Sequence, residues 1–150
     1  MSDPSASSTS DPAHARRAVE ALNSVFYEAI ESGDLDTMQE LWLDSPDTVC
    51  VHPGALPVRG TGAISRSWAL VMASTSYIQF FLTDVEVSLR RGTASVTCTE
   101  NVLTGDERTG PDAFGGGRAV ATNVFVQTPD GWRLWLHHAS PVLDASHDGD

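Results

Sequence analysis

The hydrophobic pattern of the chain changes its period at Tyr77. Before this residue, apolar side chains recur at the three- and four-residue spacing of amphipathic helices, and after it apolar and polar side chains alternate as in strands. The helical segments carry Ala18, Leu22, Val25, Phe26, Ala29 and Ile30, then Leu35, Met38, Leu41 and Trp42, then Ile64, Trp68, Val71 and Met72. Three helices followed by long antiparallel strands predict an α+β fold. We expect the helices to cover one face of a strongly curved sheet and to leave a cone-shaped apolar cavity beneath them.

Local signals mark where these segments begin, end and bend. Gly33 is expected to end the first helix as a left-handed cap, and Asp34 to cap the second. The sequence TVCVH at 48–52 is short and β-branched, which predicts an early strand. The later alternation slips at Thr83-Asp84 and predicts a β-bulge in a long, bent strand.

The last strand carries two adjacent histidines. The segment GWRLWLHHASP at 131–141 follows a Pro-Asp-Gly turn. Strict alternation places Leu136 and His138 on its apolar face and His137 on the opposite face, at a subunit interface or in solvent. His138 is therefore predicted to face the cavity. The alternative is a buried histidine whose ring is satisfied by a backbone or hydroxyl group.

Length and charge limit the class of protein. A chain of 150 residues predicts one domain, at 13–143, and the polar segments 1–12 and 144–150 are expected to be disordered tails. The net charge of −11 argues against nucleic-acid and anionic-membrane partners. No apolar run reaches the ~18–20 residues of a membrane helix, and the N-terminus lacks the features of a secretory signal. We therefore expect a cytoplasmic protein.

The sequence offers no pattern typical of a metal or cofactor site. Cys50 and Cys98 are too few for a disulfide framework and are interpreted as free thiols. The cysteines and histidines include ligand types that zinc accepts, but none of the tight paired spacings of zinc motifs is present. The glycine run at 115–117 precedes a strand and lacks the lysine of a phosphate-binding loop. We expect no metal and no cofactor.

Several polar residues are candidates for proton chemistry. His52, at a strand end beside Pro53, can accept or donate a proton near neutral pH, or its ring could simply bond to a loop carbonyl. The amide of Asn123 could donate to a developing oxyanion, or bond across the sheet. Glu100 could face the cavity, where burial would raise its pKa and its carboxylate could orient His52 or His138. If the strand parity is reversed, Glu100 instead faces solvent or an interface.

Other side chains are predicted to line the cavity as substrate-binding residues, although a single aromatic side chain at such spacing more often belongs to the core. They are Phe26, Trp68, Tyr77, Phe80 and Leu136.

Four segments resemble a known superfamily. They are FYEAIESGDLDTMQELW (26–42), TVCVHPG (48–54), VRGTGAISRSW (58–68) and NVFVQTPDGWRLWLHHASP (123–141). Together they resemble the nuclear transport factor 2-like (NTF2-like) superfamily, and most closely its SnoaL-like branch. The resemblance implies a cone-shaped α+β barrel and a homodimer packed through the outer face of the sheet. Because the superfamily includes isomerases, cyclases, dehydratases, carrier-binding proteins and assembly domains, the resemblance does not name an activity.

Ketosteroid isomerase, an enzyme of this fold, supplies positions for comparison. The resemblance places its base on His52, its late-strand acid on Asn123 and its tyrosine on Phe26, with Tyr27 expected on another helix face. Since all three positions change residue type, steroid isomerisation by that mechanism is not expected.

These observations support two hypotheses of different kinds. The first is a cofactor-independent isomerase, cyclase or dehydratase that acts on a small apolar carbonyl compound. His52 would move the proton, Asn123 with His138 would stabilise the oxyanion, and Glu100 would orient an imidazole. The alternative is a non-catalytic module that binds a hydrophobic ligand or assembles into a dimer.

Overall fold

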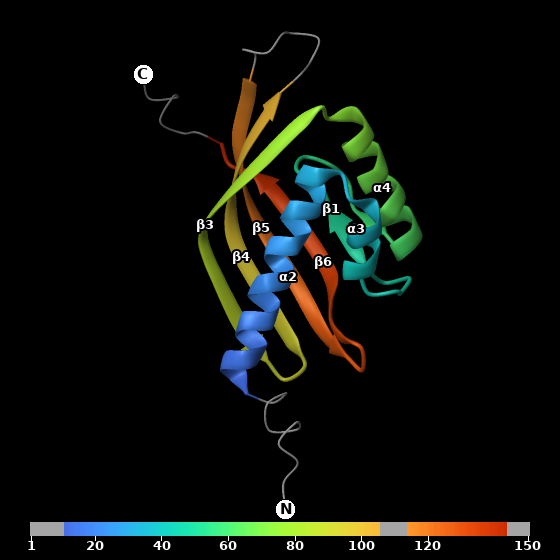
Figure 1. Cartoon of the computed structure of the whole chain (residues 1–150), viewed down its shortest axis with the longest axis vertical. Helices are drawn as coiled ribbons and strands as arrows, with labels where there is room; N and C mark the ends of the chain where they lie inside the picture. Colours follow the sequence, from blue (N-terminus) through green and yellow to red (C-terminus); the bar gives the residue numbers. More distant parts are fainter. Residues whose placement is uncertain (1–10, 106–113, 144–150) are drawn as a thin grey trace, which may run out of the picture.

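The computed structural model describes residues 11–105 and 114–143 (Figure 1). The predicted tails lie outside this part of the chain, except for two residues at the N-terminal boundary. Asp11 accepts a hydrogen bond from the backbone N–H of Ala13, and Pro12 is the first residue of the first helix. The helical part therefore begins one residue before the predicted domain boundary.

The three predicted helices are present. They are α2 (Pro12–Ser32), α3 (Leu35–Leu41) and α4 (Thr61–Ser74). Gly33 ends α2 in the left-handed conformation (φ 67°), and the Asp34 side chain accepts from the backbone N–H of Thr37, so both predicted caps are confirmed. Figure 1 shows α2 lying across the sheet, with α3 and α4 beside it near β1.

Six strands of the described residues form one curved sheet. They are β1 (Val49–Val51), β2 (Val58–Arg59), β3 (Tyr77–Arg90), β4 (Thr93–Gly105), β5 (Phe114–Thr128) and β6 (Gly131–Pro141). Their order is β2-β1-β6-β5-β4-β3, and all neighbours are antiparallel except β1 and β6. The predicted α+β class is confirmed. Because β2 and β3 are the two edges of the described sheet, the cone is open along one side.

Two bulges set which side chains face the helices. In β3 the pairing shifts between Thr83 and Glu86, where Asp84 has a φ of 53°, so the predicted bulge is confirmed. In β6, Leu134 pairs with Phe125 and Leu136 pairs with Val124, which leaves Trp135 as an extra residue. The sequence pattern carried no visible slip at this second bulge.

The bulge at Trp135 reverses the predicted parity of the two histidines. His137 points inward and is 2% exposed, whereas His138 lies on the outer face and is exposed. The prediction that His138 faces the cavity is therefore wrong, because one extra residue moves every later side chain to the other face. Leu136 is half-buried and moves with His138 to the outer face.

The core lies between the three helices and the inner face of the sheet. Phe26, Met38, Ile64, Phe125 and Leu134 are fully buried there. The same layer holds four buried polar side chains, which are Asn23, Glu100, Asn123 and His137. No described helix has the length and apolar content needed to cross a membrane.

Candidate functional site

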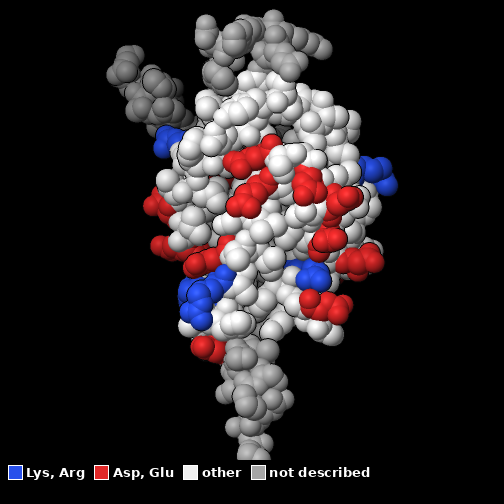
Figure 2. All heavy atoms as spheres, in the orientation of Figure 1, with Lys and Arg blue, Asp and Glu red and all other residues white. Residues whose placement is uncertain are grey.

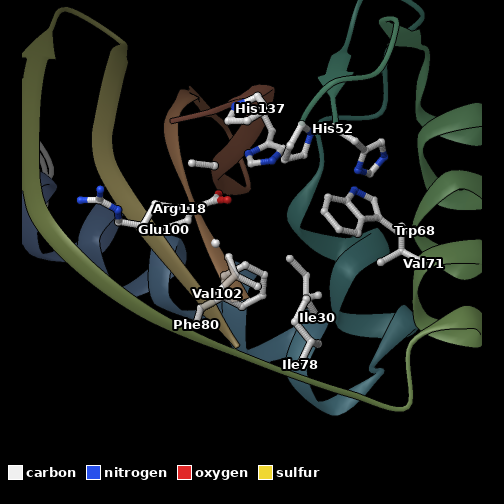
Figure 3. A pocket seen from close by; sticks show the side chains of 14 residues that line it. Ile30, His52, Trp68, Val71, Ile78, Phe80, Glu100, Val102, Arg118 and His137 are labelled. Atoms are coloured by element: carbon white, nitrogen blue, oxygen red, sulfur yellow. The ribbon is translucent and has the colours of Figure 1, made fainter. Parts of the chain in front are cut away.

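A cavity of about 320 Å³ lies between α2, α4 and the inner face of the sheet. Its walls are mainly apolar, with Ile30, Val71, Ile78, Phe80 and Val102 among the lining residues. Polar groups enter from two sides: Figure 3 shows Glu100 and His137 on the sheet side and His52 beside Trp68 on the α4 side. A ligand in this space would lie between these two groups of side chains.

The structure brings four of the predicted site residues into this cavity. His52, Glu100, Trp68 and Phe80 all line it. Glu100 is 4% exposed and faces inward from β4, which decides between the two parities considered for this strand. The positions agree with the predictions, but position alone assigns no chemical role.

His52 stands just after β1, where its ring packs against α4. Its Nε2 lies 3.0 Å from the hydroxyl oxygen of Ser67 and 3.7 Å from the Cys50 sulfur. The ring also contacts the Trp68 indole edge-on, with centroids 4.6 Å apart. Burial lowers the pKa of His52. The imidazole therefore bonds to a helix hydroxyl and not to the loop carbonyl considered as the alternative.

Glu100 is joined to α2 through a buried tyrosine. The Tyr27 hydroxyl donates to Oε2 of Glu100 at 2.6 Å and lies 3.6 Å from the Cys98 sulfur. Burial raises the pKa of Glu100, and the bond from Tyr27 opposes part of that rise. The pKa of Tyr27 is also raised, first by burial and then by the neighbouring carboxylate, so the phenol keeps its proton. Glu100 is thus a carboxyl group that can hold a proton at higher pH than an exposed glutamate.

His137 is held by the amide of Asn123. The Asn123 nitrogen donates to Oδ1 of Asn23 at 2.8 Å and to the Tyr27 oxygen at 3.2 Å, and its Oδ1 lies 2.5 Å from Nδ1 of His137. Burial, with smaller contributions from His52 and His138, lowers the pKa of His137 to about 3. The imidazole that lines the cavity is therefore neutral at physiological pH.

Several predicted site residues lie elsewhere. Asn123 is fully buried one layer behind the cavity wall, and both of its amide hydrogens are used by Asn23 and Tyr27. Direct donation from Asn123 to a ligand oxyanion therefore does not fit this geometry. Tyr77 is 42% exposed at the start of β3, and its hydroxyl donates to the side chain of Gln79. These two predicted ligand contacts are corrected by the structure.

Phe26 supports the cavity from behind. It is fully buried, and its ring packs edge-on against Trp68 at 5.4 Å and tilted against His137 at 4.8 Å. Leu136, on the outer face of β6, does not line the cavity. Phe26 therefore positions lining residues and does not itself line this space.

Three residues of the polar layer were not predicted from the sequence, and these are Asn23, Tyr27 and His137. Asn23, Tyr27 and Ile30 are spaced four and three residues apart, so they share one helix face. That face is buried, and so is the neighbouring face at Phe26, because Phe26 packs against Trp68 of α4 as well as His137 of the sheet. An asparagine and a tyrosine at this spacing beside an apolar stripe were the available signal.

Among the described residues, no three histidine, cysteine, aspartate or glutamate side chains gather as a metal site would require. Both cysteines are buried free thiols. Burial raises the pKa of Cys50 to about 12 and also raises the pKa of Cys98, so neither sulfur is an activated nucleophile at neutral pH.

Comparison with known families decides where this fold belongs. The model of the SnoaL-like domain matches residues 19–144, which is most of the chain. The chain belongs to the SnoaL-like family. This assignment places it in the NTF2-like superfamily and confirms the resemblance inferred from the sequence.

Three similar proteins illustrate how different the relatives of this SnoaL-like chain are. A structure from Streptomyces avermitilis, described as a candidate dehydratase of the NTF2-like family, is 50% identical with a TM-score of 0.81, and the match covers 89% of this chain and 100% of that one. A structure from Thiobacillus denitrificans, described as a candidate calcium/calmodulin-dependent protein kinase type II association domain, is 31% identical with a TM-score of 0.72, covering 83% and 94%.

The F-box protein SKIP8 of Arabidopsis thaliana is a more distant relative. It is 28% identical over 127 residues, which are 85% of this chain and 51% of that protein. The SnoaL-like chain thus spans about half the length of that curated relative.

Proposed function

We propose that this SnoaL-like protein is a cofactor-independent acid–base enzyme that isomerises or dehydrates a small apolar carbonyl compound. The observation that carries the proposal is the placement of Glu100 and His52 on opposite sides of one apolar cavity of about 320 Å³ (Figure 3). The Streptomyces avermitilis relative, described as a candidate dehydratase, favours the same class of reaction.

Glu100 and His52 are the proton carriers of this proposal. Burial raises the pKa of Glu100 and lowers the pKa of His52, so the two values move toward each other. A general acid or base works best when its pKa lies near the working pH. His52 would take a proton from the carbon beside the carbonyl, and the protonated Glu100 would donate to the carbonyl oxygen, which gives an enol.

Two outcomes follow from the enol. If the proton that His52 holds returns to a different carbon, the substrate is isomerised. If that proton instead joins a leaving hydroxyl group, water departs and the substrate is dehydrated. In both cases, Glu100 recovers its proton when the carbonyl forms again, so no cofactor or oxidant is consumed.

Asn123 acts as a positioning residue and His137 as a substrate-binding residue in this proposal. Asn123 lies behind the cavity and fixes the His137 ring through Nδ1, while His137 lines the cavity. With a pKa of about 3, His137 is a weak base and serves as a neutral hydrogen-bond acceptor for the substrate.

The proposal can be tested without the natural substrate. 2-Tetralone, a bicyclic apolar ketone, exchanges its α-hydrogens for deuterium through an enol, and NMR follows the exchange. The wild-type protein should accelerate exchange above buffer, and His52→Phe or Glu100→Ala should each lower that acceleration about a hundredfold, as loss of a general acid or base does. His138→Phe, on the outer face, is the matched control and should retain it. Absence of acceleration by the wild-type protein, or equal rates in all variants, would overturn the catalytic proposal.

A second function is favoured by the outer face of the sheet. Phe81 and Val120 are 53% and 48% exposed on this face, and apolar side chains on an open sheet call for a partner surface. The Thiobacillus denitrificans relative is described as an association domain. A homodimer packed through this face is therefore proposed alongside catalysis, and a dimer with no acceleration of exchange would leave assembly or ligand binding as the function.

A further inference from the structure

We infer that the ligand of this cavity is uncharged and brings a hydroxyl hydrogen to His137, and that a carboxylate of the same shape is rejected. The inference rests on the proposed function in taking this cavity as the ligand site, and it deepens that proposal by naming the substrate class as uncharged hydroxylated carbonyl compounds. It is carried by the direction of the hydrogen bonds behind the cavity wall.

The Tyr27 hydroxyl determines the direction of these hydrogen bonds. Its single hydroxyl hydrogen goes to Oε2 of Glu100, so toward Asn123 the Tyr27 oxygen can only accept. The group that Asn123 turns to Tyr27 is therefore its NH₂, which also donates to Asn23. This orientation leaves the carbonyl oxygen of Asn123 to face Nδ1 of His137 at 2.5 Å.

An amide oxygen can only accept, so Nδ1 of His137 must carry the ring hydrogen. In a neutral imidazole the other nitrogen, Nε2, then holds a lone pair and no hydrogen. His137 lines the cavity, and its Nδ1 is already engaged behind the wall. The ring nitrogen left for a ligand is an acceptor.

His52 also has one ring nitrogen that is a hydrogen-bond acceptor. The Ser67 hydroxyl donates to the carbonyl of Ile64 at 2.7 Å, so it accepts from Nε2 of His52 at 3.0 Å. The ring hydrogen of His52 is therefore on Nε2, and Nδ1 is the nitrogen without one. Both histidines of the cavity thus offer lone pairs while they are neutral.

Little in the described lining offsets a negative charge. Arg118 is its one cationic residue, and its side chain is exposed and points away from the cavity in Figure 3. The buried indole N–H of Trp68 has no hydrogen-bond partner of good geometry and interacts weakly with the Cys50 sulfur, which makes it one neutral donor. Glu100 supplies one hydrogen while it is protonated and repels an anion once it is ionised.

The charge of the surrounding surface also disfavours an anionic ligand. Acidic side chains predominate on the face that carries α2 and α3 (Figure 2), in a chain with a net charge of −11. A buried anion without a paired cation is strongly disfavoured, whereas a hydroxyl that donates to a bare imidazole nitrogen satisfies both groups.

Three probes of one ring system test the inference. 2-Naphthol has a hydroxyl donor, 2-methoxynaphthalene lacks the hydrogen, and 2-naphthoate is ionised at about pH 7. Isothermal calorimetry on the wild-type protein should give 2-naphthol about tenfold tighter binding than the ether, the usual effect of one hydrogen bond. 2-Naphthoate should bind more weakly than both.

A pair of adjacent variants locates the effect. His137→Phe keeps an aromatic ring but removes the acceptor, so it should abolish the preference for 2-naphthol over the ether. His138→Phe makes the same change on the outer face and should retain the preference.

Equal or tighter binding of 2-naphthoate in the wild-type protein would overturn the inference, as would equal binding of 2-naphthol and its ether. Absence of 2-naphthol binding at about 1 mM would also overturn it, because that is the weak end of specific affinity. These results are separable from the fate of the proposed function. Donor selectivity without exchange of 2-tetralone would support the inference and contradict catalysis, and exchange with strong 2-naphthoate binding would do the reverse.

Discussion

Replacing Asn123 with leucine should cost the protein a large part of its stability. The side chain is fully buried and makes three hydrogen bonds, to Asn23, Tyr27 and His137. In Asn123→Leu the oxygen of Asn23 and the Nδ1–H of His137 lose their partners, while Tyr27 keeps its bond to Glu100. Each unsatisfied buried group costs about 1–3 kcal/mol, so the two together predict a loss of about 4 kcal/mol.

Urea denaturation followed by circular dichroism measures this loss. With a slope of about 2 kcal/mol per molar urea, the unfolding midpoint should fall by about 2 M. Thr122→Val is the matched control, since Thr122 is the adjacent residue of β5 and pairs with His138 on the outer face. The control should move the midpoint by less than about 0.3 M, the range of ordinary surface substitutions. A loss below about 1 kcal/mol in Asn123→Leu, or equal losses in both variants, would refute the hydrogen-bond network described above.

Three further predictions concern pH, cavity size and assembly. Because the active form needs a neutral His52 and a protonated Glu100, low pH should reduce kcat/KM for 2-tetralone exchange by protonating His52, and high pH should reduce it by ionising Glu100, which gives a bell-shaped profile. Glu100→Gln should remove the alkaline fall, and a flat wild-type profile would contradict the roles. Gly117 lines the cavity with open space at its Cβ position, so Gly117→Val should weaken 2-naphthol binding in calorimetry with little loss of stability. Gly116→Ala places a Cβ 2.8 Å from a backbone oxygen and should lower the melting temperature. A larger loss of stability in Gly117→Val than in Gly116→Ala would be evidence against the described wall. Val120→Glu should convert a dimer to a monomer in sedimentation velocity, and an unchanged sedimentation coefficient would place the interface elsewhere.

The fold was predictable because long runs of alternation carry that information directly, whereas the alternation in β4 left open which face of the sheet carries Glu100. The caps at Gly33 and Asp34 and the bulge at Thr83 were also predictable, since each leaves a local mark in residue type or phase. These features depend on neighbours in sequence.

The exchange of roles between His137 and His138 was not predictable in this way. The bulge at Trp135 arises where β6 bends to pair with β5 and β1 at once, and the apolar run around it hides the change of phase. The network through Asn23 and Tyr27 also escaped prediction, because it depends on partners from β4 and β5 that are distant in sequence.

The protonation state of the His137 ring is the most direct test of the buried network and of the cavity's acceptor role. Nitrogen-15 NMR of the histidine side chains can report which ring nitrogen carries the hydrogen and where each ring titrates, and His137→Phe assigns the signal. We predict a neutral ring with hydrogen on Nδ1 and a bare Nε2, unchanged as pH falls until about pH 4, since burial lowers the pKa of His137 to about 3. Hydrogen on Nε2, or titration near the ordinary histidine pKa of about 6.5, would contradict both the buried network and the acceptor role of the cavity.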